Sequence, residues 1–92
     1  MKAEINSFSR WISEVDPMKL RKMFERDLNK AGFSILNIID HKFSPHGYTA
    51  LFLLGESHFA IHTFPEENRA YIELSSCVEE PFVKFISNLG DD

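Results

Sequence analysis

Residues 58–63 and 70–75 each alternate between apolar and polar side chains, and only a short turn separates them. A two-residue period is typical of half-buried β-strands, which place successive side chains on opposite faces. The intervening residues 65–68, Pro-Glu-Glu-Asn, favour a tight change of chain direction. The three segments together predict an antiparallel β-hairpin.

Three further strands are indicated before this hairpin. Residues 48–54 are nearly all apolar, which is typical of a strand near the centre of a sheet. Residues 33–39 are also expected to form a strand, with the Ser-Pro-His-Gly of residues 44–47 as the turn between the two. The mixed pattern of residues 4–12 is interpreted as the first strand.

Two helices complete the set of elements. In residues 17–31, apolar side chains spaced three and four apart form one stripe along a helix. Asp16 suits the capping position before this helix, and Gly32 suits the position after its last turn. A second helix is expected to begin at Pro81 and to end at Gly90.

The resulting order, β-α-β-β-β-β-α, predicts an α+β two-layer sandwich in which two helices cover one face of an antiparallel sheet. The other face must be solvated or covered by a partner chain. The 92 residues are expected to form a single domain, 1–92. Because so small a domain buries a limited share of its apolar surface, association with a second copy would help.

Composition and charge narrow the function classes. Ten Lys and Arg stand against fourteen Asp and Glu, and no basic run appears, so nucleic-acid binding is not expected. The single cysteine, Cys77, excludes an internal disulfide and fits a reducing compartment. No secretory signal is visible, and the most apolar segment, residues 50–54, is too short to span a membrane. We therefore expect a soluble, cytoplasmic protein without membrane association.

A set of short motifs lies between residues 43 and 77. In chain order they are Phe43-Ser44-Pro45-His46-Gly47, Glu56-Ser57-His58, His62-Thr63-Phe64-Pro65-Glu66 and Cys77. Each motif alone is a weak signal, but the ordered set at this spacing resembles the prokaryotic S-adenosylmethionine decarboxylase family. The resemblance is tight over residues 41–77 and looser over the helices.

The resemblance implies an enzyme that makes its own pyruvoyl cofactor by self-cleavage. The family's processing serine matches Ser57, so the chain would be cut after Glu56 into a β chain, 1–56, and an α chain, 57–92. The histidine that assists this processing matches His62.

Further roles follow from the same resemblance. Cys77 matches the cysteine that acts as the catalytic acid, and Phe43 matches the aromatic residue that stacks on the adenine of the substrate. Phe64 and Glu66 are further candidates for substrate contact, the alternatives being a core ring and a solvated turn residue. The resemblance also implies a homodimer.

These residue types suit the implied chemistry. A serine hydroxyl can attack the carbonyl of the preceding residue and convert the peptide to an ester, from which elimination leaves a pyruvoyl group. Its ketone forms a Schiff base with a substrate amine and withdraws electrons as carbon dioxide leaves. The resulting carbanion needs a proton, and a nearby thiol is a suitable acid.

Strand geometry supports one part of this site and complicates another. The hairpin register that pairs His62 with Tyr71 sets Glu56 opposite Cys77, about 5 Å apart at Cα. Five residues of a strand span roughly 16 Å, however, so Ser57 and His62 of one straight strand cannot touch. Either the strand is bent or bulged, or a second protomer completes the site.

A metal site is not expected. His58 and His62 would lie roughly 13 Å apart on one strand, too far for shared ligation.

Three functions stay open from the sequence. The first is decarboxylation of S-adenosylmethionine for spermidine-type polyamine synthesis, and the second is the same pyruvoyl chemistry on ornithine or arginine. The third is an inactive homologue that binds a partner decarboxylase or a small ligand. Departures from the family pattern, such as Ser75-Ser76 in place of Phe-Thr and Val78 in place of glycine, bear mainly on the choice of substrate.

Overall fold

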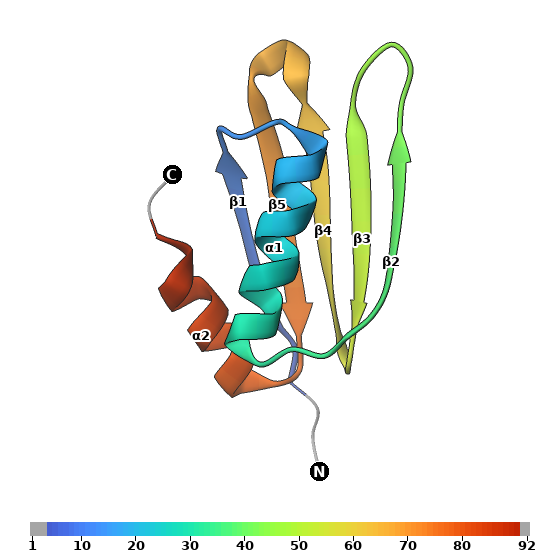
Figure 1. Cartoon of the computed structure of the whole chain (residues 1–92). Helices are drawn as coiled ribbons and strands as arrows, with labels where there is room; N and C mark the ends of the chain where they lie inside the picture. The colour runs from blue at the N-terminus through green and yellow to red at the C-terminus, as the bar shows by residue number, and fades with distance from the viewer. Residues whose placement is uncertain (1–3, 91–92) are drawn as a thin grey trace.

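A computed structural model describes residues 4–90 of the chain. Within this range the chain forms five strands, two α-helices and one short 3-10 helix (Figure 1). In chain order the elements are β1 (Asn6–Ile12), α1 (Pro17–Ala31), β2 (Ile35–Lys42), β3 (Tyr48–Leu54), β4 (Ser57–Phe64), η1 (Pro65–Glu67), β5 (Arg69–Ser76) and α2 (Glu79–Leu89).

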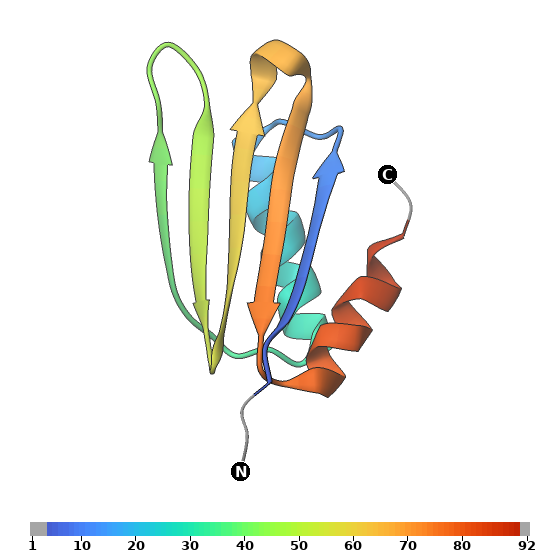
Figure 2. The same cartoon turned by 180° about the vertical axis from the view of Figure 1, so that it is seen from behind.

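The strands form one antiparallel sheet in the order β1-β5-β4-β3-β2. Both helices lie on one face of this sheet (Figure 1), and the view from behind shows the opposite face without a helix (Figure 2). The expected α+β two-layer sandwich is confirmed. No helix within residues 4–90 has the length and apolar character needed to cross a membrane.

Helix α1 has the bounds that its sequence predicts, because both of its ends are specified locally. The Asp16 carboxylate accepts the N–H of Lys19 at 2.9 Å, and Gly32 ends the helix in the left-handed region at φ 105°. The apolar stripe is buried against the sheet and consists of Leu20, Phe24, Leu28 and Ala31.

Three other elements have bounds that differ from the prediction by two residues or more. Strand β2 covers residues 35–42 instead of 33–39, because it stays paired with β3 to its end while Phe33 is buried in the core. Helix α2 begins two residues before Pro81, which is tolerated in a first turn because its missing N–H is not needed there. Strand β1 begins two residues later than expected.

Phenylalanine rings fill the space between the sheet and the helices. The ring centroid of Phe59 on β4 lies 4.9 Å from that of Phe24 on α1, 5.6 Å from Phe52 on β3 and 5.5 Å from Phe85 on α2. All four side chains are almost fully buried. This cluster ties both helices to β3 and to β4, the strand that carries Ser57, His62 and Phe64.

The uncovered face of the sheet exposes large apolar side chains. Ile39 on β2 is 64% exposed, and Leu51 and Leu53 on β3 are 50% and 54% exposed. The same face carries a cluster of aromatic rings formed by Trp11, Phe64 and Tyr71. Burial of apolar surface is favourable, so this face is suited to a partner.

Candidate active site

The Glu56–Ser57 peptide lies at the tip of the hairpin between β3 and β4. Strands β4 and β5 pair in the predicted register, with His62 opposite Tyr71. At the end of β5, the Cys77 thiol donates a hydrogen bond to the Glu56 carbonyl oxygen, with Sγ and oxygen 3.0 Å apart. The thiol therefore lies beside the bond that the motifs mark for cleavage.

Ser57 approaches the same peptide from the buried side. It belongs to the face of β4 that also buries Phe59 and Ile61, and it is 9% exposed. Its hydroxyl donates to the hydroxyl of Ser76, the residue paired with it on β5, at 2.7 Å. Cys77, in contrast, is exposed. A buried hydroxyl and an exposed thiol thus flank one peptide group.

The backbone is strained at the residue that supplies the carbonyl. Glu56 has φ 60°, in the left-handed region. This region costs a residue with a side chain roughly 1–2 kcal/mol, and asparagine tolerates it better than glutamate does. The other non-glycine residue with positive φ among residues 4–90 is Asn68, next to η1.

A second group of predicted residues lies at the opposite end of the sheet. A hollow of about 240 Å³ is lined there by nine residues, among them Phe43, His62, Phe64 and Glu66. Phe43 is 51% exposed, and its ring lies against that of His41 with the two ring centroids 4.5 Å apart. The other lining residues are His46, Gly47, Tyr48, Thr49 and Thr63.

Polar contacts orient the side chains around this hollow. His62 Nδ1 lies 3.1 Å from the hydroxyl of Thr49, and Glu66 Oε2 lies 3.6 Å from His46 Nε2. The His46–Glu66 pair is half exposed on both sides, so solvent weakens its attraction.

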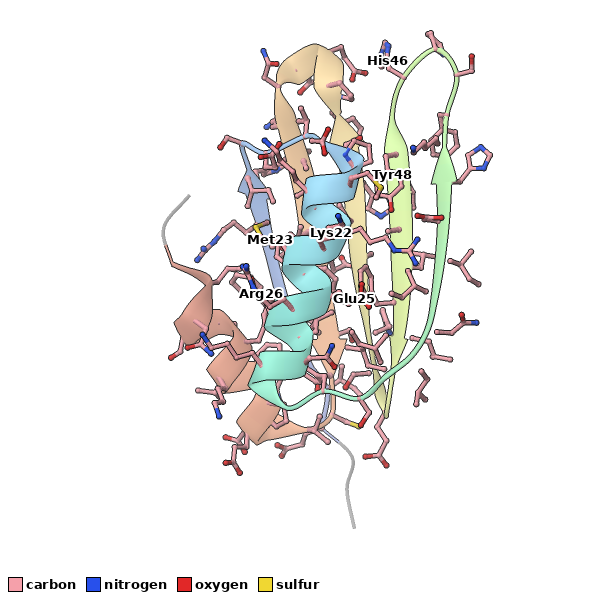
Figure 3. The ribbon with its side chains drawn as sticks, viewed as in Figure 1. Lys22, Met23, Glu25, Arg26, His46 and Tyr48 are labelled. Carbon is pink, nitrogen blue, oxygen red and sulfur yellow. The ribbon has the colours of Figure 1, made fainter. Side chains whose placement is uncertain are left out.

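A buried tyrosine supports the same end of the sheet from the helix side. The Tyr48 hydroxyl donates to the Asp40 carboxylate at 2.6 Å, and Arg21 of α1 pairs with that carboxylate at 2.8 Å. Burial and the bond to Asp40 raise the pKa of Tyr48 to about 12. The bond from Tyr48, joined by Arg21, lowers the pKa of Asp40. Figure 3 shows Tyr48 beside α1, below His46 in the turn between β2 and β3.

The two groups of residues do not meet within one chain. Strand β4 runs from Ser57 at one end of the sheet to Phe64 at the other (Figure 1). Five residues of strand separate Ser57 from His62, roughly 16 Å, and β4 pairs with β5 and β3 without a register shift. Successive strand residues also alternate between faces, so His62 lies on the face opposite to the Ser57 side chain.

Sequence reasoning missed two contributors to this arrangement. In the sequence Ser76 stands out only as a departure from the family pattern, although the hairpin register places it opposite Ser57. The Tyr48–Asp40–Arg21 cluster joins three separate elements, and no spacing along the chain signals it.

A larger hollow, about 880 Å³, lies between α1, β1 and the end of α2, and none of the predicted site residues lines it. Lys22, Met23 and Arg26 line it from α1 (Figure 3).

Comparison with known proteins identifies the family. A family profile described as S-adenosylmethionine decarboxylase matches residues 12–89. A proenzyme of this name from Prochlorococcus marinus (strain MIT 9313) is 40% identical over 65 residues, which are 71% of this chain and 52% of that protein. "S-adenosylmethionine decarboxylase proenzyme 2" of Bacillus anthracis is 49% identical over 47 residues, which are 51% of this chain and 38% of that protein. The chain thus spans about half the length, or less, of these curated relatives.

The fold has a solved counterpart as well. The adenosylmethionine decarboxylase of Aquifex aeolicus superposes with a TM-score of 0.72 at 24% identity, covering 97% of this chain and 82% of that one. Identity at this level shows a shared fold. Since the family profile covers most of the sequence, from residue 12 to residue 89, the chain belongs to the S-adenosylmethionine decarboxylase family.

Proposed function

We propose that this chain is a proenzyme that cleaves itself between Glu56 and Ser57 and then, as a homodimer, decarboxylates S-adenosylmethionine. The observation that carries the proposal is the 3.0 Å hydrogen bond from the Cys77 thiol to the Glu56 carbonyl oxygen. The residue that follows this carbonyl is Ser57, whose side chain is buried. The relatives named above are proenzymes of this decarboxylase.

Self-cleavage begins with an acyl shift at this peptide. The Ser57 hydroxyl oxygen attacks the carbonyl carbon of Glu56, the carbon–nitrogen bond breaks, and the hydroxyl proton is transferred to the nitrogen that leaves. Negative charge grows on the carbonyl oxygen during the attack, and the hydrogen bond from Cys77 stabilises it. The left-handed backbone of Glu56 favours the same step if its strain is released as the peptide becomes an ester.

The ester then breaks by elimination. Ser57 loses its Cα proton, its Cβ–Oγ bond breaks, and Glu56 leaves as a carboxylate that ends the chain 1–56. Addition of water and loss of ammonia from the new end of chain 57–92 leave a pyruvoyl group there. This group would supply an electron-withdrawing ketone for the loss of carbon dioxide.

Cys77 is proposed to act in turnover as well. Its exposed thiol lies at the point where the new terminus forms, and a thiol can hand a proton to carbon once carbon dioxide has left. It is thereby proposed as the catalytic acid, the role that the family resemblance implies for it.

Substrate binding is assigned to the opposite end of the sheet. The half-exposed aromatic side chain of Phe43 suits an adenine ring, and Phe64 and Glu66 line the same hollow. Because this end lies about a strand length from Ser57, the two halves of the site need two chains.

A two-fold homodimer supplies the missing half. If two copies stack their uncovered faces with β4 antiparallel to its counterpart, the hollow of one chain comes next to the cleavage end of the other. The stacked faces would bury Leu51, Leu53 and Ile39, which are at least half exposed in the single chain.

Release of carbon dioxide tests the proposed activity. The chain is incubated until cleavage is complete and then assayed with carboxyl-labelled S-adenosylmethionine, ornithine and arginine, with Ser57→Ala as the inactive control. We expect release from S-adenosylmethionine alone or far in excess of the other two. A preference for ornithine or arginine, or release by Ser57→Ala, would contradict the proposal.

A further inference from the structure

The Ser76 hydroxyl, at the end of β5, uses every hydrogen-bonding position it has. Its oxygen accepts the proton of the Ser57 hydroxyl at 2.7 Å and the N–H of Val78 at 3.0 Å. Its own proton is donated to the Val78 carbonyl at 3.2 Å. A hydroxyl offers one donor and two acceptor positions, so this group is saturated, and it is 1% exposed.

The bond from Ser57 has a consequence for the attacking oxygen. Because the Ser57 proton points at Ser76, the lone pairs of the Ser57 oxygen remain for the carbonyl carbon of Glu56. The bond also restricts the rotation of the Ser57 side chain, which is otherwise short and free to choose among three staggered positions. Ser76 therefore holds the nucleophile in one orientation.

The two hydrogen bonds between the Ser76 hydroxyl and the Val78 backbone act on Cys77, which lies on the exposed side of the Glu56–Ser57 peptide. They close the turn of residues 76–78, with Cys77 in its middle, directly before α2 begins at Glu79. The shape of this turn aims the Cys77 thiol at the Glu56 carbonyl oxygen. One hydroxyl thus fixes both groups that flank the scissile peptide.

We infer that Ser76 is a positioning residue for self-cleavage, acting on Ser57 through a direct hydrogen bond and on Cys77 through the 76–78 turn. The inference rests on the proposed function, since it concerns the same peptide bond. It adds a residue that touches neither the carbonyl nor the substrate.

Cleavage rates of matched variants test the role. Ser76→Thr keeps the hydroxyl, whereas Ser76→Val has nearly the same shape as threonine without it. Ser75→Ala is the neighbouring control, because Ser75 points to the opposite face and its side chain makes no hydrogen bond within residues 4–90. Cleavage is followed by intact-protein mass over time at one pH.

We expect Ser76→Thr and Ser75→Ala to cleave within about threefold of the unchanged chain, and Ser76→Val to be slower by roughly 10- to 100-fold, the range for a misplaced reacting group. Hydroxylamine, which cuts esters, should trap less ester in Ser76→Val. Equal rates for the threonine and valine variants would overturn the inference while leaving the proposed function intact. An unchanged chain that never cleaves would overturn both.

A second readout does not depend on cleavage. In a Ser57→Ala background, which keeps the chain whole, alkylation of Cys77 by iodoacetamide reports how firmly the turn holds the thiol. Adding Ser76→Val should raise the alkylation rate at least threefold over Ser76→Thr, with both proteins folded by circular dichroism. Equal alkylation rates would show that Ser76 does not position Cys77.

Discussion

At the scale of single residues, the proposed self-cleavage depends on one peptide bond held in an unusual environment. Glu56 carries left-handed backbone strain, and its carbonyl oxygen accepts a thiol proton while the Ser57 hydroxyl lies on the buried side. No one of these features is diagnostic by itself. All of them occur at Glu56 and Ser57, the pair that the motifs mark, and together they support the proposal of self-cleavage.

Replacing the thiol separates turnover from processing. Cys77→Ala removes the group placed to donate a proton, so we expect decarboxylation to fall at least about 100-fold, the usual minimum for a lost general acid. Cleavage should slow less, because the Glu56 carbonyl loses one hydrogen bond but keeps its strain. Carbon dioxide release and the cleavage time course measure the two effects, and normal decarboxylation would remove Cys77 from the mechanism.

Relieving the strain at Glu56 should slow self-cleavage. Glycine adopts φ 60° without a Cβ clash, so Glu56→Gly lowers the energy of the uncleaved chain by roughly 1 kcal/mol, which corresponds to a rate about fivefold lower. Asn68→Gly makes the same kind of change at φ 53°, far from the bond, and should leave the rate unchanged. Cleavage of Glu56→Gly at the rate of the parent chain would show that the strain is not used.

At the scale of elements, the sequence was most informative where the signals are local. Helix α1 has a capping residue before it and a glycine after it, so the sequence predicts its bounds. The β4–β5 hairpin has alternating side chains and a turn sequence between them, so the sequence predicts its register. Helix α2 has no side-chain cap at Val78, and β2 extends as far as its pairing with β3, so the start of α2 and both ends of β2 differ from the prediction. Contacts between distant elements, such as that of Ser76 with Ser57, need the folded chain.

The contact of Tyr48 with Asp40 gives an element-scale test. The raised pKa of Tyr48, about 12 against an ordinary 10.0, means that the folded chain binds this proton more tightly than the unfolded chain. The stabilisation is complete below pH 10 and is lost as the pH rises toward 12. Tyr48→Phe should lower stability at pH 8 by about 1–2 kcal/mol and lose this pH dependence.

Thermal unfolding between pH 8 and 12 measures the effect of Tyr48, with Tyr71→Phe on the uncovered face as the control. A domain of this size shifts its midpoint by about 4–8 °C per kcal/mol. If Tyr48→Phe lost stability in parallel with the parent chain above pH 10, the tyrosine would have no part in the pH dependence.

At the scale of the whole molecule, the sheet separates the two halves of the proposed site. Phe43, His62 and Glu66 lie at one end, while Ser57 and Cys77 lie at the other, so a single chain cannot bring them together. The uncovered apolar face between the two ends offers the surface on which a second copy would restore the site.

A charge on the uncovered face should break the dimer. Leu53→Glu places a carboxylate at the proposed interface, at a residue that is 54% exposed. Val83→Glu places one on α2 at a residue that is 55% exposed and lies outside the proposed interface. In sedimentation equilibrium we expect the first variant to be monomeric and the second to remain dimeric. A monomeric parent chain with full activity would exclude the shared site.

Mixing variants tests whether the site is shared. Ser57→Ala cannot cleave, and His62→Ala should cleave poorly as a homodimer. In a mixed dimer, the His62→Ala chain should recover cleavage because the partner supplies the histidine. The control is each variant incubated alone, which should show no such recovery. If dimers shown to be mixed do not recover cleavage, His62 does not act in the processing site of the other chain.

The most direct test is the intact mass of the purified, folded chain after incubation. We predict two species, residues 1–56 with an ordinary carboxyl end and residues 57–92 with a pyruvoyl group in place of the Ser57 amino end, and a single uncut species for Ser57→Ala. An uncut chain of 92 residues that persists through long incubation while remaining folded would contradict self-cleavage.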